Sequence, residues 1–465
     1  MENSDKYSFT GLLFSKRIWV SILDMIGLAL LYSMRTCISV AIVKMTKFIP
    51  SESNITECAI LNQSSQKGEF DWDQSLQSTI LSSFYYGYTV FMIPTGILAD
   101  KFGGKMAILC SVFASSLFTI LTPLSTYIHV DLLIIVRVLA GISQCPFYQG
   151  SVIILNRWCA TFEISTYLVI ALSGAYVGTI ISQPLTGYLS SIDFMHGWPL
   201  AFYVFGVLGI IWCFAWYMLI TENPEDNKYV THTEKLFIQK HSITKPELDS
   251  IPWFQIFTYI PLYIICVSEV GISLYFYVFL SELPTYLSNA LGVSLESEGL
   301  LSALPFISIF VGINISGPLA DILTRITSSK KNIRRLLMGF GSVTPLLFIL
   351  CVDPAGCNSV LVVFLISGSM LFLGASYAQT SCNLMETFPV HTGIAYGLLN
   401  TAANIQGILA PYFVELFTKG HIHEIKYWQY MFITSSMVLV MTTTVFAIFI
   451  KTDPPKWARG NDTML

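Results

Sequence analysis

The stretch Gly96-Ile97-Leu98-Ala99-Asp100-Lys101-Phe102-Gly103-Gly104-Lys105 decides the fold of this 465-residue chain. Its paired glycines permit a tight turn and a close approach of two helices, and the Asp100 carboxylate can accept from helix-end amides or pair with a basic neighbour. Such contacts could latch one end of a helical bundle. The simpler interpretation is a charged turn beside a membrane helix. The candidate gating residues here are Gly96, Asp100, Lys101, Gly103 and Lys105.

A related stretch, Gly317-Pro318-Leu319-Ala320-Asp321, returns in the second half of the chain with Arg325 behind it. One copy is easily explained as a turn, but two copies indicate a duplicated unit and favour a role in gating. Asp321 and Arg325 therefore join the candidate gating residues.

Long apolar runs surround both stretches. The chain is 54% hydrophobic and only 12% charged, against roughly 25% charged in an average soluble domain. Residues 76–220 contain eight Asp, Glu, Lys or Arg, whereas the next thirty residues, 221–250, contain ten. This distribution argues against a soluble globular domain and predicts membrane spans followed by a solvated loop.

Twelve stretches are long enough to cross a bilayer, because a hydrocarbon core about 30 Å thick requires ~20 apolar residues per helix. The expected spans are residues 18–43, 76–98, 105–127, 131–155, 166–190, 198–220, 257–283, 298–321, 335–352, 359–382, 393–417 and 428–450. The sequence thus predicts an all-α membrane protein of twelve transmembrane helices in two six-helix halves. Parallel repeats of this kind build the major facilitator fold, whose substrate site lies near the midplane between the halves. The expected divisions are 1–220, a cytoplasmic linker 221–256, 257–450 and a tail 451–465.

The distribution of basic residues predicts the orientation, because cytoplasmic loops are enriched in Lys and Arg. With the amino terminus inside, 18 of the 25 basic residues lie inside and 5 outside. Both termini are therefore expected in the cytoplasm. The loop 44–75 then lies outside, and it carries two glycosylation sequons, at Asn54 and Asn62. Neither tail shows an acidic dileucine signal, which favours the plasma membrane over a vesicle or lysosome.

Two arginines, Arg35 and Arg137, lie within expected spans. A bare arginine at membrane depth costs from ~3 to more than 10 kcal/mol, so it normally faces a watery cavity or a counter-charge. A guanidinium group also matches carboxylate and phosphate in a two-pronged geometry. An anionic substrate is a natural counter-charge, and snorkelling to the membrane surface is the alternative.

Other polar residues in the spans could serve transport. Glu269 and Glu386 could take up a proton for coupling, or they could pair with an arginine or an amide. Hydroxyl and amide groups could point toward a cavity, although such groups also pack helices in bilayers. The further substrate candidates are Tyr85, Tyr86, Gln144, Tyr275, Tyr277, Asn383 and Asn400.

Other functional classes find little support. The net charge of −4 shows no excess of basic residues that could bind nucleic acid. No P-loop or catalytic cluster is evident, so an enzyme is not expected. The ten cysteines form no CxxC pair, and neither a zinc site nor a disulfide framework is indicated; His421 and His423 are a poor metal pair. We expect no cofactor except a co-transported Na⁺ or H⁺, and a monomer that contacts membrane lipid and a small anion.

The chain resembles solute carrier family 17 of anion transporters, which includes sialin, the sodium-phosphate cotransporters and the vesicular glutamate and nucleotide transporters. The resemblance extends over almost the whole chain and includes the facilitator signature quoted first. It rests further on Arg35 followed by Val40-Ala41-Ile42-Val43, and on Phe70-Asp71-Trp72-Asp73, Ile80-Leu81-Ser82-Ser83-Phe84-Tyr85-Tyr86-Gly87-Tyr88, Gly197-Trp198-Pro199, Pro252-Trp253, Leu283-Pro284-Thr285-Tyr286 and Gly299-Leu300-Leu301-Ser302-Ala303-Leu304-Pro305. The resemblance implies that Arg35 and Arg137 handle an anionic substrate.

The chain also departs from the family pattern. It has Gln144 where the sialin and glutamate branches have a glutamate linked to proton coupling, and Ile272 where glutamate carriers have an arginine. The family's Asp-Ile-Ala-Pro-Arg reads Glu386-Thr387-Phe388-Pro389-Val390 here. These changes favour coupling to sodium or membrane potential in a carrier of organic or inorganic anions. A proton-coupled carrier of acidic sugars or amino acids using Glu269, and a non-transporting anion sensor, remain as alternatives.

Overall fold

The computed structural model describes residues 15–47, 68–160, 163–192, 194–241, 253–327, 330–388, 392–451 and 455. The side chains of a few further residues inside helices, among them Asp100, Asp321 and Arg325, are not described, and the sequons at Asn54 and Asn62 lie outside the described residues. Helices dominate the described chain, and a single bridge pairs Thr46 with Phe70.

The helices occupy the places that the apolar runs predict. Their bounds are α2 Lys16–Met45, α4 Gln74–Phe102, α5 Gly104–Ile128, α6 Val130–Gln144, α7 Pro146–Trp158, α8 Ile164–Leu172, α9 Gly174–Ser191, α10 Trp198–Leu219, α11 His232–His241, α12 Trp253–Thr258, α13 Ile260–Asn289, α14 Leu295–Thr327, α15 Lys330–Leu350, α16 Val352–Ala355, α17 Ser359–Thr387, α18 Thr392–Thr418 and α19 Ile425–Phe449. Within the described residues, ten helical segments are long and apolar enough to cross a membrane. The long helices α4 and α18 stand at the other two expected spans, which confirms the all-α membrane fold.

Two expected spans are each divided into a pair of helices. The span expected at 131–155 is divided between Gln144 and Pro146, because proline has no N–H for the preceding turn and is favoured at the first position of a new helix. The span expected at 166–190 is divided between α8 and α9, just before Gly174.

The chain forms two compact units, which we describe separately. The first unit contains residues 1–35, 90–179 and 202–251, and the second contains 36–89, 180–201 and 252–465. Parts of α2, α4 and α9 thus belong to each unit.

Tryptophans hold the helices of the first unit together. Trp212 and Trp216 of α10 stack with ring centroids 5.1 Å apart. The Trp212 indole N–H donates to the Leu23 carbonyl of α2 at 3.0 Å, and that of Trp216 donates to the Lys105 carbonyl of α5 at 3.2 Å. The indole of Trp158 donates to the Thr221 carbonyl at 3.1 Å. Each large apolar ring is therefore buried with its one donor satisfied.

Two glycines let α9 pack directly on α2 in the first unit. A Cβ atom at Gly174 or Gly178 would overlap the backbone carbonyl of Met25 or Ala29. Small residues at this four-residue spacing are typical of closely packed membrane helices. The Ser33 hydroxyl also donates to the Gly178 carbonyl at 3.1 Å, which fixes the position of α2 two residues before Arg35.

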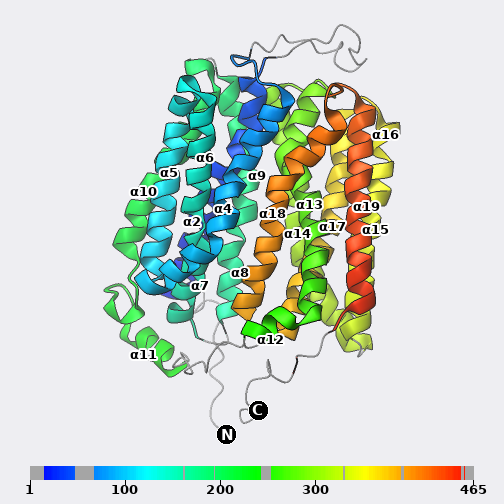
Figure 1. Ribbon diagram of the computed structural model, residues 1–465. Helices are drawn as coiled ribbons and strands as arrows, with labels where there is room; N and C mark the ends of the chain where they lie inside the picture. Colours follow the sequence, from blue (N-terminus) through cyan, green and yellow to red (C-terminus); the bar gives the residue numbers. More distant parts are fainter. Residues whose placement is uncertain are drawn as a thin grey trace. The chain divides into compact units, whose positions relative to one another are not determined.

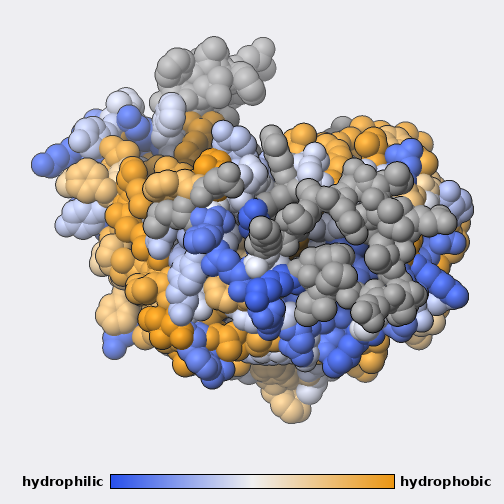
Figure 2. Space-filling model, turned by 90° about the horizontal axis from the view of Figure 1, so that it is seen from above, coloured by the Kyte–Doolittle hydropathy of each residue, from blue (hydrophilic) through white to orange (hydrophobic). Residues whose placement is uncertain are grey.

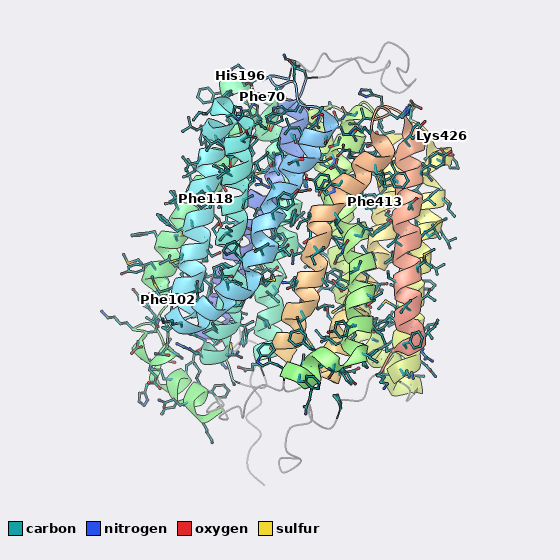
Figure 3. The ribbon with its side chains drawn as sticks, in the orientation of Figure 1. Phe70, Phe102, Phe118, His196, Phe413 and Lys426 are labelled. Carbon is teal, nitrogen blue, oxygen red and sulfur yellow. The ribbon has the colours of Figure 1, made fainter. Side chains whose placement is uncertain are left out.

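Aromatic contacts hold the second unit together. Helix α13 packs against α17, α18 and α19, and α13 and α19 run side by side in Figure 1. Phe279 stacks on Phe432 at 4.9 Å, and Tyr286 lies 5.2 Å from Trp428. At one end of the unit, where Figure 3 labels Phe70 and His196, the Trp198 indole donates to the Glu69 carboxylate at 3.2 Å.

The exposed side chains are largely apolar along the helices. Phe214 is 66% exposed, Phe364 69% and Leu416 77%. In Figure 2, hydrophobic residues occupy much of the visible surface, and hydrophilic residues gather in separate patches. Apolar surface of this extent fits contact with lipid.

One cysteine differs from the expectation of no disulfide. Cys357, in the connection between α16 and α17, is disulfide-bonded, and its partner lies outside the described residues. The other eight described cysteines are free. No CxxC pair in the sequence indicated this bond.

Candidate functional site

The two membrane arginines lie together in the first unit. Arg35 on α2 and Arg137 on α6 are each 3% exposed, and Arg137 Nη2 donates to the backbone carbonyl of Arg35 at 3.3 Å. The guanidinium carbon of Arg35 lies 5.0 Å from the ring centroid of Tyr32, in a cation–π contact. Two residues that the sequence identified separately, about a hundred positions apart, thus belong to one polar cluster.

Two tyrosines and Gln144 extend this cluster. The hydroxyls of Tyr32 on α2 and Tyr148 on α7 lie 2.9 Å apart, and Gln144 Nε2 donates to the Leu31 carbonyl at 3.2 Å. The sequence did not single out Tyr32 or Tyr148. Tyr32 precedes Arg35 by three residues, so the helical repeat alone places both on one face of α2.

A second polar cluster lies in the second unit. The rings of Tyr85 on α4 and Tyr277 on α13 meet edge to face at 5.2 Å. The Tyr277 hydroxyl donates to Asn404 Oδ1 at 2.9 Å, and Asn404 Nδ2 donates to Asn400 Oδ1 at 3.0 Å. Three residues proposed from the sequence therefore come together here through Asn404, which the sequence analysis missed.

Tyr86 and Tyr275 hold helices together. The Tyr86 hydroxyl is hydrogen-bonded to that of Tyr412 on α18. The Tyr275 hydroxyl donates to Ser369 Oγ on α17 at 2.9 Å, and Tyr275 has no exposed surface.

Three polar residues of α13 and α17 have protein partners. Glu269 accepts from Ser273 at 3.2 Å and is hydrogen-bonded to Tyr377. Glu386 forms an ion pair with Arg334 of α15 at 2.7 Å. Asn383 donates to the Lys451 carbonyl at 2.9 Å. Glu386 and Asn383 thus join helix ends, as the structural alternative for Glu386 anticipated, while Glu269 is held by two hydroxyl groups.

The gating stretch surrounds a carboxylate that the sequence did not identify. Glu222, just after α10, accepts from the backbone N–H groups of Gly104 and Lys105, both at 2.9 Å, and from Arg157 Nη1 at 2.7 Å. It therefore caps the N-terminus of α5, where a negative charge is favoured. Gly103 has φ +89°, and a Cβ atom there would lie 2.7 Å from the Glu222 carboxyl carbon.

The other gating candidates are placed around this turn. The Lys105 ammonium donates to the Tyr217 carbonyl at 3.1 Å, and Lys101 Nζ lies 6.0 Å from the Phe102 ring centroid. A Cβ atom at Gly96 would lie 3.4 Å from the Gln149 side chain. Phe102 marks this end of the first unit in Figure 3.

Gly103→Ala should destabilise the protein by roughly 1–3 kcal/mol, because alanine is strained at a positive φ and its methyl group would displace Glu222. The measurement is the midpoint of thermal unfolding of the purified protein. Gly420→Ala is the matched control, because Gly420 also has a positive φ of 79° but has nothing within 4 Å of a Cβ atom. Equal effects of the two substitutions would show that the Glu222 contact adds nothing.

The linker helix α11 is attached to the first unit. The Arg17 guanidinium, at the start of α2, pairs with Glu163 before α8 and with Glu234 of α11. The Phe237 ring lies 4.7 Å from the same group. Nearby Cys159 is a neutral thiol, because burial raises its pKa to about 12.

Comparison with known proteins places this arrangement in a family. The family model described as Major Facilitator Superfamily matches residues 25–411. Sialin from Ovis aries is 32% identical, covering 96% of this chain and 91% of that protein. A putative inorganic phosphate cotransporter from Drosophila melanogaster is 30% identical over 97% of this chain and 87% of its own. Vesicular glutamate transporter 1 from Bos taurus is 28% identical, covering 96% of this chain and 79% of that protein.

Solved structures agree on the fold. A bacterial homologue of the human lysosomal transporter Spinster, in an inward-facing and occupied conformation, is 15% identical with a TM-score of 0.67, covering 96% of this chain and 98% of that chain. A D-xylose–proton symporter is 14% identical, also with a TM-score of 0.67, covering 93% of this chain and 97% of that chain. The chain therefore belongs to the major facilitator superfamily, in the family of sialin, and is a membrane transporter rather than an enzyme.

Proposed function

We propose that this protein is a secondary active transporter that moves small organic or inorganic anions by alternating access. The observation that carries the proposal is the pairing of two buried arginines, Arg35 and Arg137, on adjacent membrane helices. Arginines at this depth require an anionic or watery partner, and the guanidinium fork suits carboxylate and phosphate. Relatives named for phosphate and glutamate support an anionic substrate.

The cluster suggests a role for each side chain. Arg35 would bind the anion in a two-pronged contact, with the Tyr32 ring orienting its guanidinium through the cation–π contact. Tyr148 and Gln144 would supply neutral hydrogen bonds at the edge of the site, and Arg137 would add positive charge while fixing the backbone of α2. The second cluster, from Tyr85 to Asn400, would offer hydroxyl and amide groups within the second unit.

Contacts between α4 and α18 provide a basis for alternating access. The Ser78 hydroxyl donates to the Pro411 carbonyl at 3.3 Å, and that of Ser82 donates to the Ile408 carbonyl at 2.9 Å. Tyr86 meets Tyr412 one turn along. A few hydroxyl bonds of this kind can form and break at a modest cost in free energy. We propose that they close the outer end of the transport path.

We propose that transport is coupled to sodium or to membrane potential. The reason is that Gln144 replaces the glutamate that is linked to proton coupling in the sialin and glutamate branches. One observation favours a second candidate, a proton-coupled carrier of acidic sugars or amino acids. Glu269 is 2% exposed on α13, and its hydrogen-bond partners, Ser273 and Tyr377, are neutral. A carboxyl group so placed could be protonated and deprotonated during the cycle. We propose no other cofactor.

Uptake into proteoliposomes tests the function and separates the two candidates. A panel of labelled phosphate and carboxylate anions is offered while a sodium gradient, a membrane potential and a pH gradient are imposed one at a time. Stimulation by inward sodium or by potential is expected, and stimulation by a pH gradient alone would favour the second candidate. Failure of the protein to move any anion under either gradient would overturn the proposal.

We further propose that the protein is a monomer in the plasma membrane, with both termini cytoplasmic. The orientation rests on the asymmetry of basic residues, on the two sequons and on the disulfide at Cys357, because disulfides form in oxidising compartments. The choice of the plasma membrane rests on the lack of an acidic dileucine signal in either tail.

A protease added outside intact cells should leave the chain uncut near Lys240, while glycosidase treatment should reduce its apparent mass through Asn54 and Asn62. Permeabilised cells are the control, because the protease then reaches the linker. Cleavage at Lys240 in intact cells would show that the orientation is reversed.

A further inference from the structure

A groove lies beside the start of α2 in the first unit. Its volume is about 410 Å³, which is within the range of roughly 300–1,000 Å³ that is typical of small-molecule sites. The first turns of α2 form one wall, and the end of α10 with the connection toward α11 forms the other. The chain passes from the lower end of α10 into this connection in Figure 1. All of the lining residues belong to the first unit.

Side-chain hydrogen bonds fix the wall that the connection forms. The Asn227 side chain donates to the Leu219 carbonyl at 3.0 Å and accepts from the Tyr229 N–H at 2.8 Å, so the chain folds back on the end of α10. Trp158 also lines the groove, and its indole bond to the Thr221 carbonyl holds the start of the connection. The protein therefore forms the groove through its own contacts, before any ligand binds.

The groove is apolar inside and aromatic at its exposed edge. Val20 and Ile220 are buried, whereas Trp19 is 58% exposed and Tyr229 is 60% exposed. Tryptophan and tyrosine are enriched where a membrane meets water, at the level of the lipid headgroups. Because α2 crosses the membrane and Trp19 lies in its first turn, the groove lies at this boundary and is within reach of lipid.

Lys16 is the one charged residue among those that line the groove. Its side chain is exposed, and it has no ion-pair partner among the residues that the structure describes. The nearby charges are already paired or bonded: Arg17 pairs with Glu163 and Glu234, and the Glu225 carboxylate accepts from α11 at 2.6 Å. The groove thus presents a single positive charge, which an anionic group would balance.

The chemistry of an anionic phospholipid fits this combination. Its acyl chains would fill the apolar part of the groove, and its phosphate would meet the Lys16 ammonium. A soluble anion would gain nothing from the apolar walls, and a neutral apolar ligand would gain nothing from the lysine. Anionic lipids are concentrated in the cytoplasmic leaflet, where basic pockets between membrane helices bind lipid headgroups.

We propose that this groove binds one anionic phospholipid of the inner leaflet, with its phosphate at Lys16 and one acyl chain along Val20, Ile26 and Leu219. The choice of leaflet rests on the proposed orientation, but the site does not depend on which anion is transported. The lipid would contact both the start of α2 and the connection after α10. Its binding would therefore stabilise the state in which these two segments are in contact.

Lipid binding to the purified full-length protein tests the site without reference to transport. Native mass spectrometry measures the affinity for dioleoylphosphatidylglycerol and for dioleoylphosphatidylcholine, which has the same acyl chains but no net charge. The wild type should bind one phosphatidylglycerol roughly fivefold more tightly, because one lysine near a charged lipid contributes about this factor. Lys16→Gln should remove the preference and leave the affinity for phosphatidylcholine unchanged.

Ile26→Trp tests the part of the site that holds the acyl chain. Ile26 lines the groove and is 41% exposed, so the larger side chain can occupy the groove without entering the core. The affinity for both lipids should fall several-fold, while the preference for the anionic lipid stays. Glycerol 3-phosphate, which has no acyl chain, should leave the unfolding temperature of the wild type unchanged.

Lys331→Gln is the matched control for surface charge. Lys331 is also exposed in the first turn of a membrane helix, α15, and its substitution should keep the fivefold preference. Equal affinity of the wild type for the two lipids, or an unchanged preference in Lys16→Gln, would overturn the site and leave only non-specific contact with lipid. Unchanged affinity in Ile26→Trp would overturn the acyl-chain groove.

Stabilisation by glycerol 3-phosphate equal to that by phosphatidylglycerol would show that a soluble phosphate is bound and that the lipid assignment is wrong. Anion uptake by the same preparations is scored separately. Uptake without specific lipid binding would remove the lipid site and preserve the anion transporter, and specific lipid binding without uptake would do the reverse.

Discussion

Arg35→Lys should lower the apparent affinity for the transported anion by roughly ten- to a hundredfold. Lysine keeps the positive charge but loses the two-pronged contact and the planar packing against Tyr32. Losing one charge-assisted hydrogen bond of ~1.5–3 kcal/mol gives a change of this size. Arg35→Ala should lower uptake further, because Arg137 alone would then balance the anion.

The measurement is the concentration dependence of uptake at matched surface expression. Arg335→Lys is the control: this arginine lies on α15 and its Nη2 donates to the Ile448 carbonyl at 3.0 Å, so uptake should stay normal. Wild-type affinity and rate in both Arg35 variants would show that the anion does not meet Arg35. The assignment would then move to Arg137.

Gly407→Val should reduce uptake roughly 5- to 150-fold while leaving binding of the anion at Arg35 and Arg137 nearly unchanged. A Cβ atom at Gly407 on α18 would overlap the ring of Tyr85, so the closed contact between α4 and α18 could not form. Overpacking of ~1–3 kcal/mol acting on one state alone shifts its population by about 5- to 150-fold. The open state and its arginines are not affected.

Uptake rate and anion-dependent thermal stabilisation are compared for Gly407→Val and for Gly397→Val. Gly397 lies on the same helix with nothing within 4 Å of a Cβ atom, so its substitution should be tolerated. Normal uptake by Gly407→Val would mean that α4 and α18 need not meet during transport.

The sequence predicted the spans well because bilayer thickness imposes a length on every apolar run. It also identified Arg35 and Arg137, since a charge inside such a run is rare and costly. Tyr32 and Tyr148 were missed because tyrosine is common in membrane helices and only their hydroxyl contact distinguishes them.

Residues whose partners are distant in the chain were also missed. Glu222 meets backbone groups 118 and 117 positions away, and no local pattern marks it.

The way the two units divide the chain has a consequence for biosynthesis. Every residue of the first unit precedes residue 252, so this unit can be completed while the remainder is still being translated. Residues 36–89 and 180–201 belong instead with helices that are made last. During that interval, Tyr85 and Gln183, which are buried in the complete protein, lack their final neighbours. Substitutions in these two segments should therefore affect the yield of protein at the membrane more than equally buried substitutions in the first unit.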